Sequence, residues 1–224
     1  MIIEATALTK DFARARGGAR VFTAVHPLDL GLDEGELTLV SGHSGSGKST
    51  LLNMLAGMLT PTAGSVRIDD TDLYSLRDEE LSRLRNERIG LVPQGHTALR
   101  ALTVLDNVLL PSVLYNRAEA PAERARELLD NVGLGDLADA KPTELSGGEL
   151  RRMAIARALL MNPSIILADE PTAGLDSANA AGVLTLLRNA ADAGAAVLVV
   201  SHEAEASRYA QRCYTMEDGH LSQQ

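Results

Sequence analysis

Residues 42–50 read Gly42-His43-Ser44-Gly45-Ser46-Gly47-Lys48-Ser49-Thr50. This stretch fits the phosphate-loop pattern, in which a glycine and four further residues precede Gly-Lys-Ser. A short apolar run at 37–41 predicts a strand before it. After it, leucines recur at helical spacing, namely Leu51, Leu52, Leu55 and Leu59. A strand, a glycine-rich loop and a helix N-terminus together form an anion site, so the stretch predicts a nucleotide-binding α/β domain.

The side chains of the loop have distinct predicted roles. Glycines allow the backbone to wrap closely around a phosphate, and successive N–H groups point at it. Lys48 supplies a positive charge for the β- and γ-phosphates, and the Ser49 hydroxyl can ligate Mg²⁺. We therefore expect the nucleotide to be bound by Gly42, Ser44, Gly45, Ser46, Gly47, Lys48, Ser49 and Thr50.

Three further polar residues follow predicted buried strands. Asp169 and Glu170 end the apolar run 165–168, and His202 follows the apolar run 196–200. A carboxylate at such a place costs several kcal/mol (about 2–7 even for a neutral polar group) unless a partner or metal satisfies it. Asp169 fits a direct or indirect partner of Mg²⁺, and Glu170 could polarise a water for attack on the γ-phosphate. His202 could sense that phosphate from the same edge of the sheet.

The rest of the chain alternates between strand and helix patterns at both ends. Continuous apolar runs such as 165–168 and 196–200 fit a parallel sheet covered on both faces. Residues 95–160 instead contain helical patterns and almost no strand signal, so they form a candidate helical subdomain. Residues 2–8 and 21–32 are predicted strands that precede the phosphate loop.

Composition excludes several classes of protein. The 224 residues carry a net charge of −9, which argues against a broad nucleic-acid footprint. No apolar run approaches the roughly 20 residues of a membrane helix, and no secretory signal begins the chain. Cys213 is the single cysteine, so no disulfide forms within the chain and a reducing compartment is expected. Any action at a membrane therefore requires a partner.

A second glycine-rich stretch, Leu145-Ser146-Gly147-Gly148-Glu149, lies about a hundred residues after the first. With it, the chain resembles the nucleotide-binding domain of ATP-binding cassette (ABC) proteins over essentially its whole length. Six motifs occur in the family's order: the Walker A loop 42–50, the Q-loop Gln94, the signature 145–149, Walker B 165–170, the D-loop Gly174-Leu175-Asp176 and the switch histidine His202.

The resemblance implies a fold and a set of domains. We expect a P-loop NTPase of ABC type, an α/β protein with a mainly parallel sheet core, an N-terminal antiparallel β subdomain and an inserted helical subdomain. The whole chain, 1–224, would be a single ABC ATPase domain. Its core would cover about 1–93 and 162–224, and its helical subdomain about 94–161.

The resemblance also implies an assembly that binds ATP and Mg²⁺. Two cassettes, identical or closely related, pack head to tail in this family, so Ser146, Gly147 and Gly148 would serve the partner's nucleotide. Asp176, in the D-loop, would also belong to the nucleotide-binding residues. Catalysis would fall to Glu170, His202 and Gln94, and Mg²⁺ to Ser49, Gln94 and Asp169. The chain would drive a separate integral-membrane permease through the region from Gln94 to Val108. It would then be cytoplasmic and peripheral on the inner membrane, without direct insertion and without nucleic acid.

Two residues leave alternatives open. Phe12 is the candidate aromatic that stacks on adenine because it follows Leu8-Thr9-Lys10, and Phe22 competes with it. Glu149 stands where the family usually has glutamine. A carboxylate facing phosphates would be repelled, so Glu149 would face a ribose hydroxyl, a backbone N–H or solvent. It could equally be an acid that complements the helix dipole.

Within the family, the chain is similar to the lipoprotein-release and macrolide-export group, which includes a cell-division cassette. The similarity rests on residues 44–53, Leu102-Thr103-Val104, Asp106-Asn107-Val108 and Pro111. His43, and the absence of Gly-Asn before Leu175, depart from that group. A transport motor is the leading hypothesis, and a regulatory cassette that signals through a permease without transport is the alternative. A soluble cassette acting on nucleic acid fits less well, since one cassette is present and 51 residues separate Gln94 from Ser146.

Overall fold

The computed structural model describes residues 1–14, 20–95, 97–114 and 121–224. Within these residues, six strands form a sheet in the order β10-β9-β3-β8-β7-β6. Their bounds are β3 (Leu37–Ser41), β6 (Ile89–Val92), β7 (Ile165–Asp169), β8 (Ala196–Ser201), β9 (Arg212–Glu217) and β10 (His220–Gln223). All neighbours are parallel except β10, which pairs with β9 in the antiparallel sense. Every residue of β7 and β8 is buried, which explains their continuous rather than alternating apolar pattern.

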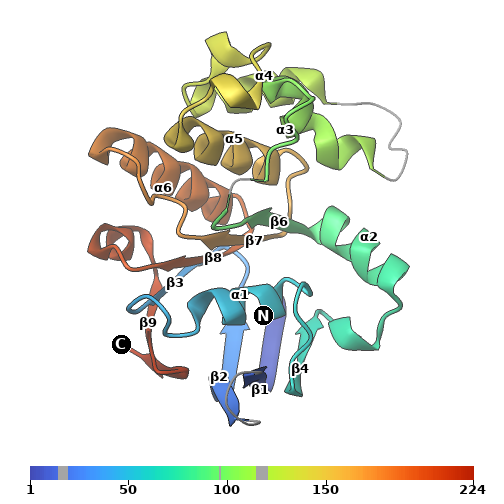
Figure 1. Ribbon diagram of the computed structural model, residues 1–224, viewed down its shortest axis with the longest axis vertical. Coiled ribbons are helices and arrows are strands. Elements are labelled where there is room, and N and C mark those ends of the chain that lie inside the picture. The colour runs from blue at the N-terminus through green and yellow to red at the C-terminus, as the bar shows by residue number, and fades with distance from the viewer. Residues whose placement is uncertain (15–19, 96, 115–120) are drawn as a thin grey trace.

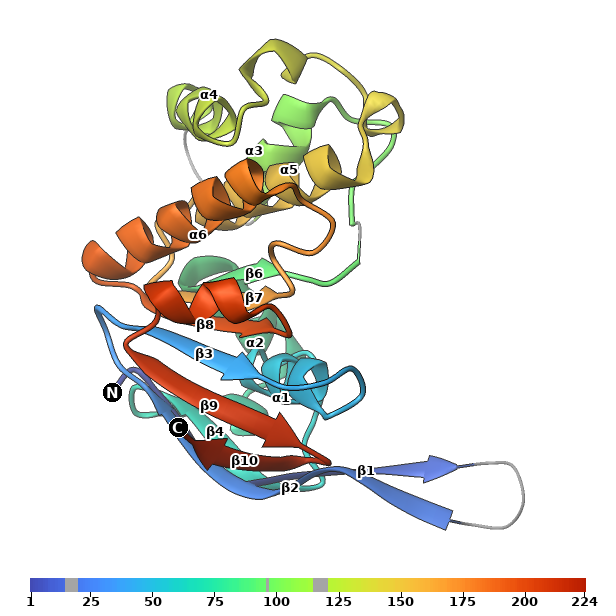
Figure 2. The ribbon, with the colours of Figure 1, turned by 90° about the vertical axis from the view of Figure 1, so that its left-hand side faces the viewer.

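A second, antiparallel sheet lies beside the first (Figure 2). In the described parts of the chain its order is β2-β1-β4-β5. The strands are β1 (Ile3–Arg14), β2 (Arg20–Leu32), β4 (Ala63–Ile68) and β5 (Thr71–Asp72). The predicted strand at 2–8 is thus longer than expected, because its continuation pairs with β2 out to Arg14. Together, β1 and β2 project beyond the body of the molecule as a long ribbon.

Some helices lie against the sheets, and others form a separate layer at one end of the molecule (Figure 1). They are α1 (Lys48–Leu55), α2 (Asp78–Arg88), α3 (Val104–Val113), α4 (Ala122–Asn131), α5 (Gly147–Leu159) and α6 (Ser177–Asp192), with short 3-10 turns η1 (Leu73–Ser75), η2 (Gly135–Leu137), η3 (Pro142–Glu144) and η4 (Ala204–Tyr209). Helices α3, α4 and α5 lie together at one end of the molecule. The predicted fold class, with its antiparallel β subdomain and inserted helices, is confirmed.

The first helix is shorter than its leucine pattern predicted. Helix α1 ends at Leu55, and Gly57 adopts a φ of +64° that turns the chain out of the helix. Leu59 therefore lies beyond the helix, although it still packs against the core. The half-buried Tyr74 hydroxyl donates to the carbonyl oxygens of Met54 (2.5 Å) and Leu59 (2.8 Å), which fixes this helix end.

The parallel sheet separates two hydrophobic clusters. Leu39, Ile166 and Val197 face a cluster that includes the buried side chains of α3, α4, α5 and α6. Val40 and Leu167 face the other cluster, which includes the buried side chains of α1 and of the antiparallel sheet. Alternate residues of one strand therefore serve different clusters, as expected of a strand whose side chains point to opposite faces.

Candidate functional site

The predicted site residues converge because they follow neighbouring parallel strands. The phosphate loop follows β3, and His202 follows β8, which pairs directly with β3. Glu170 follows β7, and Gln94 comes two residues after the end of β6. The carboxyl ends of parallel strands lie at one edge of the sheet, where ligands of open α/β sheets bind. The sheet order thus explains why residues far apart in sequence meet.

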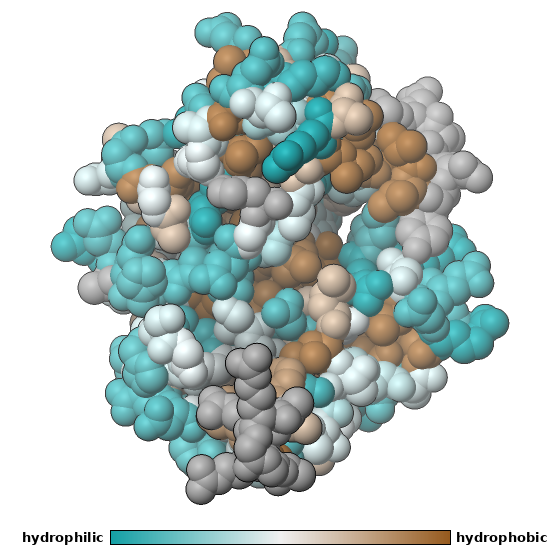
Figure 3. Space-filling model, in the orientation of Figure 1, coloured by the Kyte–Doolittle hydropathy of each residue, from teal (hydrophilic) through white to brown (hydrophobic). Residues whose placement is uncertain are grey.

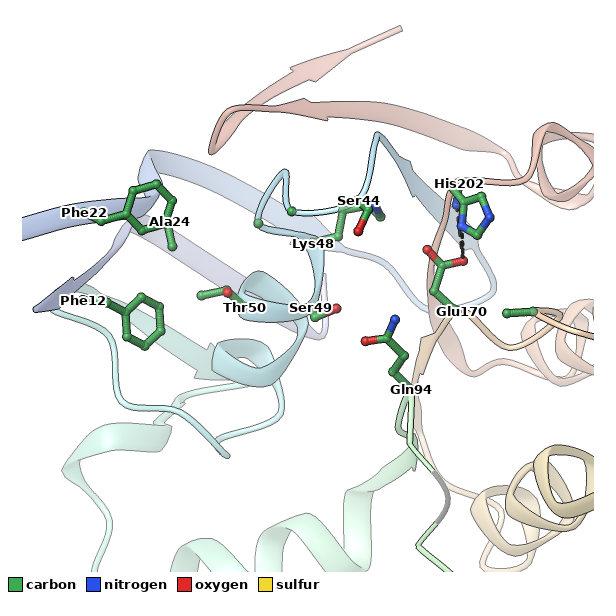
Figure 4. Close-up of a pocket in the computed structure, with 13 residues that line it drawn as sticks. Phe12, Phe22, Ala24, Ser44, Lys48, Ser49, Thr50, Gln94, Glu170 and His202 are labelled. Atoms are coloured by element: carbon green, nitrogen blue, oxygen red, sulfur yellow. Dashed lines mark hydrogen bonds and ion pairs between the residues drawn. The ribbon is translucent and has the colours of Figure 1, made fainter. Parts of the chain in front are cut away.

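A cavity of about 350 Å³ opens at this edge (Figure 4). It is lined by Phe12, Phe22, Ala24, Ser44, Gly45, Gly47, Lys48, Ser49, Thr50, Gln94, Glu170, Ala173 and His202. In Figure 4 the side chains of Ser49, Gln94 and Glu170 point into the same space, with the two phenyl rings at its far end. Most residues predicted from the sequence to bind nucleotide or act on it therefore share one cavity.

The phosphate loop is built as its pattern requires. Lys48 is buried, and its ammonium donates to the carbonyl oxygens of Gly42 (2.6 Å) and His43 (3.0 Å), which holds it across the loop. Gly47 has a φ of +107°, and a Cβ there would lie 2.4 Å from the carbonyl oxygen of Ala24. Only glycine therefore fits this position, from which α1 begins. The cation and the helix N-terminus both favour an anion in the cavity.

Glu170 and His202 form a hydrogen-bonded pair in the cavity wall. The Oε2 atom of buried Glu170 lies 2.9 Å from Nδ1 of His202 and accepts from the Ser201 hydroxyl at 3.3 Å. The hydrogen bond to Glu170, and then its negative charge, raise the pKa of His202 above its ordinary value. The pair therefore favours a cationic imidazole beside a carboxylate that is held in one orientation.

The backbone of Glu170 is strained and tightly held. Its φ of +50° lies in the left-handed region, which costs about 1–2 kcal/mol for a residue with a Cβ. Its N–H donates to the carbonyl oxygen of Val200 at 2.8 Å. Its own carbonyl oxygen accepts from the N–H of Ala173 at 3.2 Å and from the Arg151 guanidinium. Such strain persists only where the surroundings determine the conformation.

The corner of the site at Ser49 carries oxygen donors that suit Mg²⁺: Ser49 and Gln94 line the cavity, and Asp169 accepts a hydrogen bond from Ser49. Asp169 is buried, and among the described residues its Oδ1 atom has no hydrogen-bond partner. Burial raises the pKa of this carboxyl group, although a hydrogen bond from Ser49 opposes the shift. A hydroxyl, a carboxylate and an amide are all oxygen donors of the kind Mg²⁺ binds. The unsatisfied buried oxygen is therefore consistent with a cation at this corner.

Comparison with known proteins identifies the architecture. The sequence pattern described as "ABC transporter" matches residues 25–173. The chain belongs to the ABC transporter family. It is an ATP-binding cassette that hydrolyses ATP. The predictions of family, fold class, ATP binding and ATPase activity are thus confirmed.

Relatives of this cassette share most of its length. The lipoprotein-releasing system ATP-binding protein LolD of Myxococcus xanthus is 40% identical over 88% of each chain. The macrolide export ATP-binding/permease protein MacB of Aggregatibacter actinomycetemcomitans is 36% identical over 98% of the cassette, which spans 34% of that relative. A dimeric post-hydrolysis structure of the ATP-binding cassette MJ0796, bound to ADP and Pi, aligns with a TM-score of 0.91 at 36% identity, covering 99% of this chain and 98% of that one.

The signature residues of the cassette, which were predicted to serve the partner's nucleotide, do not line the cavity of their own chain. Ser146 is exposed at the start of α5 and is its N-cap. The carboxylate of Glu149 accepts from the Ser146 N–H and hydroxyl, both at 2.7 Å, and these bonds lower the pKa of Glu149. Glu149 therefore completes a capping box with Ser146. Two of the alternatives raised for Glu149 are thus observed together, namely a backbone N–H partner and a position as an acid in the first turn of the helix. Asp176 is likewise exposed and caps α6 by accepting from the N–H of Asn179 at 2.9 Å.

Both candidate adenine-stacking residues line the cavity. Phe12 and Phe22 are register partners on β1 and β2, and their side chains are 40% and 43% exposed. The Lys10 ammonium lies 5.2 Å from the centre of the Phe12 ring. The choice between the two rings thus stays a prediction, because cross-strand pairing places both at one end of the cavity.

Sequence reasoning missed several residues at this site. Ala24 and Ala173 line the cavity. Thr172 is buried and donates to Glu203, which ties the turn after β7 to the turn after β8. Arg151 contacts both Glu170 and Gln94 through their main chains. The one available signal was the arginine pair Arg151-Arg152 after the signature, and the structure shows that Arg151 is the one that turns toward Glu170 and Gln94.

Proposed function

We propose that two copies of this cassette, or one copy and a close paralogue, pack head to tail and hydrolyse ATP at two shared sites. Each ATP would lie between the phosphate loop of one copy and Ser146, Gly147 and Gly148 of the other. One observation carries this proposal. The signature residues form a helix N-terminus, an anion-binding element, at which Ser146 and Gly147 are exposed and Gly148 is half-buried. They do not line their own chain's cavity. Asp176, exposed at the start of α6, would belong to the same contact.

The residues of the cavity divide the chemistry between them. Gly42, Ser44, Gly45, Ser46 and Gly47 would wrap the phosphates, together with Lys48 and Thr50. Glu170 would take a proton from the attacking water while His202 holds its carboxylate, and Gln94 would orient that water. Mg²⁺, held by Ser49, Gln94 and Asp169, would neutralise charge that develops on the phosphates. Phe12 would stack on adenine.

A complementation experiment tests the shared site. Lys48→Ala removes the cation of the phosphate loop, and Gly147→Asp puts a carboxylate where the partner's phosphate would bind. Each variant alone should be inactive. In a head-to-tail heterodimer of the two, one site carries both defects and the other carries neither, so mixing should restore ATPase activity. If each chain instead formed its complete site alone, the mixture would stay inactive.

We further propose that the cassette drives a separate integral-membrane permease of the lipoprotein-release and macrolide-export type, from the cytoplasmic face of the inner membrane. None of the described helices is long and apolar enough to span a membrane. The region from Gln94 to Val108 is the proposed contact. Beside it, Figure 3 shows apolar side chains around a hollow between the upper helices and α2. A groove there is lined by Ala56, Met58, Ser82, Arg85, Asn86, Ile89, Leu91 and Leu114.

Exposed apolar side chains support this contact. Met58 is 57% exposed, Leu114 is 52% exposed, and Leu99 within the proposed region is 51% exposed. The test is co-sedimentation of the ATP-loaded cassette with membranes that contain the permease, followed by identification of the cross-linked protein. Leu114→Asp should release the cassette from those membranes. Val21→Asp alters a similarly exposed residue on β2, in the antiparallel sheet, and should not.

A further inference from the structure

Arg151 connects helix α5 to two turns of the site, one at Glu170 and one at Gln94, which are distant from each other in the sequence. It lies on α5, one turn after the signature glycines. One terminal nitrogen of its guanidinium donates to the carbonyl oxygen of Glu170, and the other donates to the carbonyl oxygen of Gln94 at 3.2 Å. The side chain is half-buried, so it is held between these partners rather than extended into solvent.

Arginine suits this position because its planar fork presents several donors in fixed directions. Two carbonyl oxygens that belong to different loops can therefore be held at a constant separation by one side chain. A lysine ammonium is a compact charge on a flexible stem and imposes no such geometry. The two loops held by Arg151 are those that present Glu170 and Gln94 to the cavity.

The carbonyl that Arg151 contacts belongs to a residue in a strained conformation. Glu170 has a φ of +50°, and its peptide N–H is fixed by the carbonyl oxygen of Val200. On the other side of the residue, the carbonyl oxygen has only the N–H of Ala173 at 3.2 Å besides Arg151, among the described residues. Loss of the guanidinium would therefore leave the main chain of Glu170 free to relax on that side.

We propose that Arg151 is a positioning residue for ATP hydrolysis, which fixes the main chains of Glu170 and Gln94 so that both side chains meet in the cavity. This inference rests on the proposed roles of Glu170 and Gln94. Because α5 begins with Ser146 and Gly147, Arg151 also links the helix that would meet the partner's nucleotide to the carboxylate of its own chain. Arg151 does not line the cavity and need not touch ATP.

The experiment compares two arginines that make similar bonds. Arg151→Met keeps the apolar stem but removes both donors. Arg124→Met does the same to an arginine that donates to the main-chain carbonyl oxygens of Leu159 and Leu160, away from the cavity. We expect Arg151→Met to lower kcat by about 10- to 100-fold, the scale of a misplacement of about 1 Å, with the KM for ATP unchanged. Arg124→Met should lower Tm and leave kcat unchanged.

Repeating the Arg151→Met substitution in a catalytically impaired variant distinguishes loss of positioning from a general structural defect. If Arg151 acts through Glu170 and Gln94, adding Arg151→Met to a variant that already carries Glu170→Gln and Gln94→Ala should cause no further loss of residual activity. A further loss in that triple variant, or an unchanged kcat in Arg151→Met, would overturn the inference. Arg151→Lys, which keeps the charge, should give an intermediate kcat, and a Lys variant with full kcat would also overturn it, even if Arg151→Met fails to fold. Failure of the proposed function is distinct, because Glu170→Gln itself would then hydrolyse ATP normally.

Discussion

Replacing Glu170 with glutamine removes the proposed base while keeping the shape of the site. The carboxylate accepts hydrogen bonds at Oε2 from Ser201 and faces Nδ1 of His202. A glutamine carbonyl oxygen can occupy the same position and keep these contacts. The change therefore removes the ability to take a proton without opening the cavity or releasing the nucleotide.

The expected loss of kcat follows from the removal of the general base alone. A positioned general base is typically worth about 10²–10⁴ in rate, which corresponds to about 2.7–5.4 kcal/mol of activation free energy. We expect Glu170→Gln to lose that much kcat. Binding of ATP should be unaffected, because no phosphate-loop residue changes. ATP would then persist in the shared sites, and the variant should accumulate as an ATP-bound dimer.

Two measurements check this prediction. Steady-state phosphate release gives kcat and KM, and light scattering with ATP and Mg²⁺ gives the mass of the complex. The unchanged cassette under the same conditions is the control. Near-normal hydrolysis by the variant would show that Glu170 is not the base. A variant that loses turnover but stays monomeric with ATP would contradict the head-to-tail site.

Other perturbations have equally specific outcomes. Lys48→Ala should weaken ATP binding by about 10- to 100-fold in a titration, since a charge-assisted hydrogen bond contributes about 1.5–3 kcal/mol; an unchanged Kd would refute its role. The pKa of His202 is raised by Glu170, so their attraction stabilises the fold fully below the ordinary histidine pKa and is lost as pH rises through the raised value. His202→Ala should therefore cost more stability at pH 5 than at pH 9 in urea titrations, and a cost independent of pH would contradict the ion pair. Tyr74→Phe removes the hydroxyl that holds the end of α1 and should cost about 1 kcal/mol, or about 2–4 °C in Tm by calorimetry. An unchanged Tm would show that this hydroxyl contributes no net stability.

Local sequence was sufficient wherever a functional residue directly follows a buried strand. The apolar run before Asp169 and Glu170 predicted both the strand and the edge at which they lie. His202 was placed by the same reasoning. The parallel order of β3, β8, β7 and β6 then brought these turns together. The positions of these residues can be predicted because each motif directly follows its strand in the sequence.

Features that depend on strand register or on side-chain direction could not be predicted from the local sequence. The pairing of Phe12 with Phe22 places both rings in the cavity, and one sequence does not disclose that register. The turn of Arg151 toward Glu170 depends on the rotation of α5 about its axis. The early end of α1 depends on Gly57, whose left-handed backbone outweighs the periodic leucines. The capping role of Glu149 was among the alternatives, and geometry was needed to select it.

The two-sided sheet has a consequence for how the molecule unfolds. The buried side chains of α3, α4 and α5 complete a cluster that includes Leu39, Ile166 and Val197, while the phosphate-loop helix rests on the opposite cluster. Excised from the chain, the segment that carries α3, α4 and α5 would lose the strands against which these helices pack. Because short helices are marginal in water without such packing, this segment should not fold by itself. Strands β7 and β8 contribute side chains to both hydrophobic clusters, so exposing their backbone requires both clusters to open. We therefore expect the amide protons of β7 and β8 to exchange last with solvent.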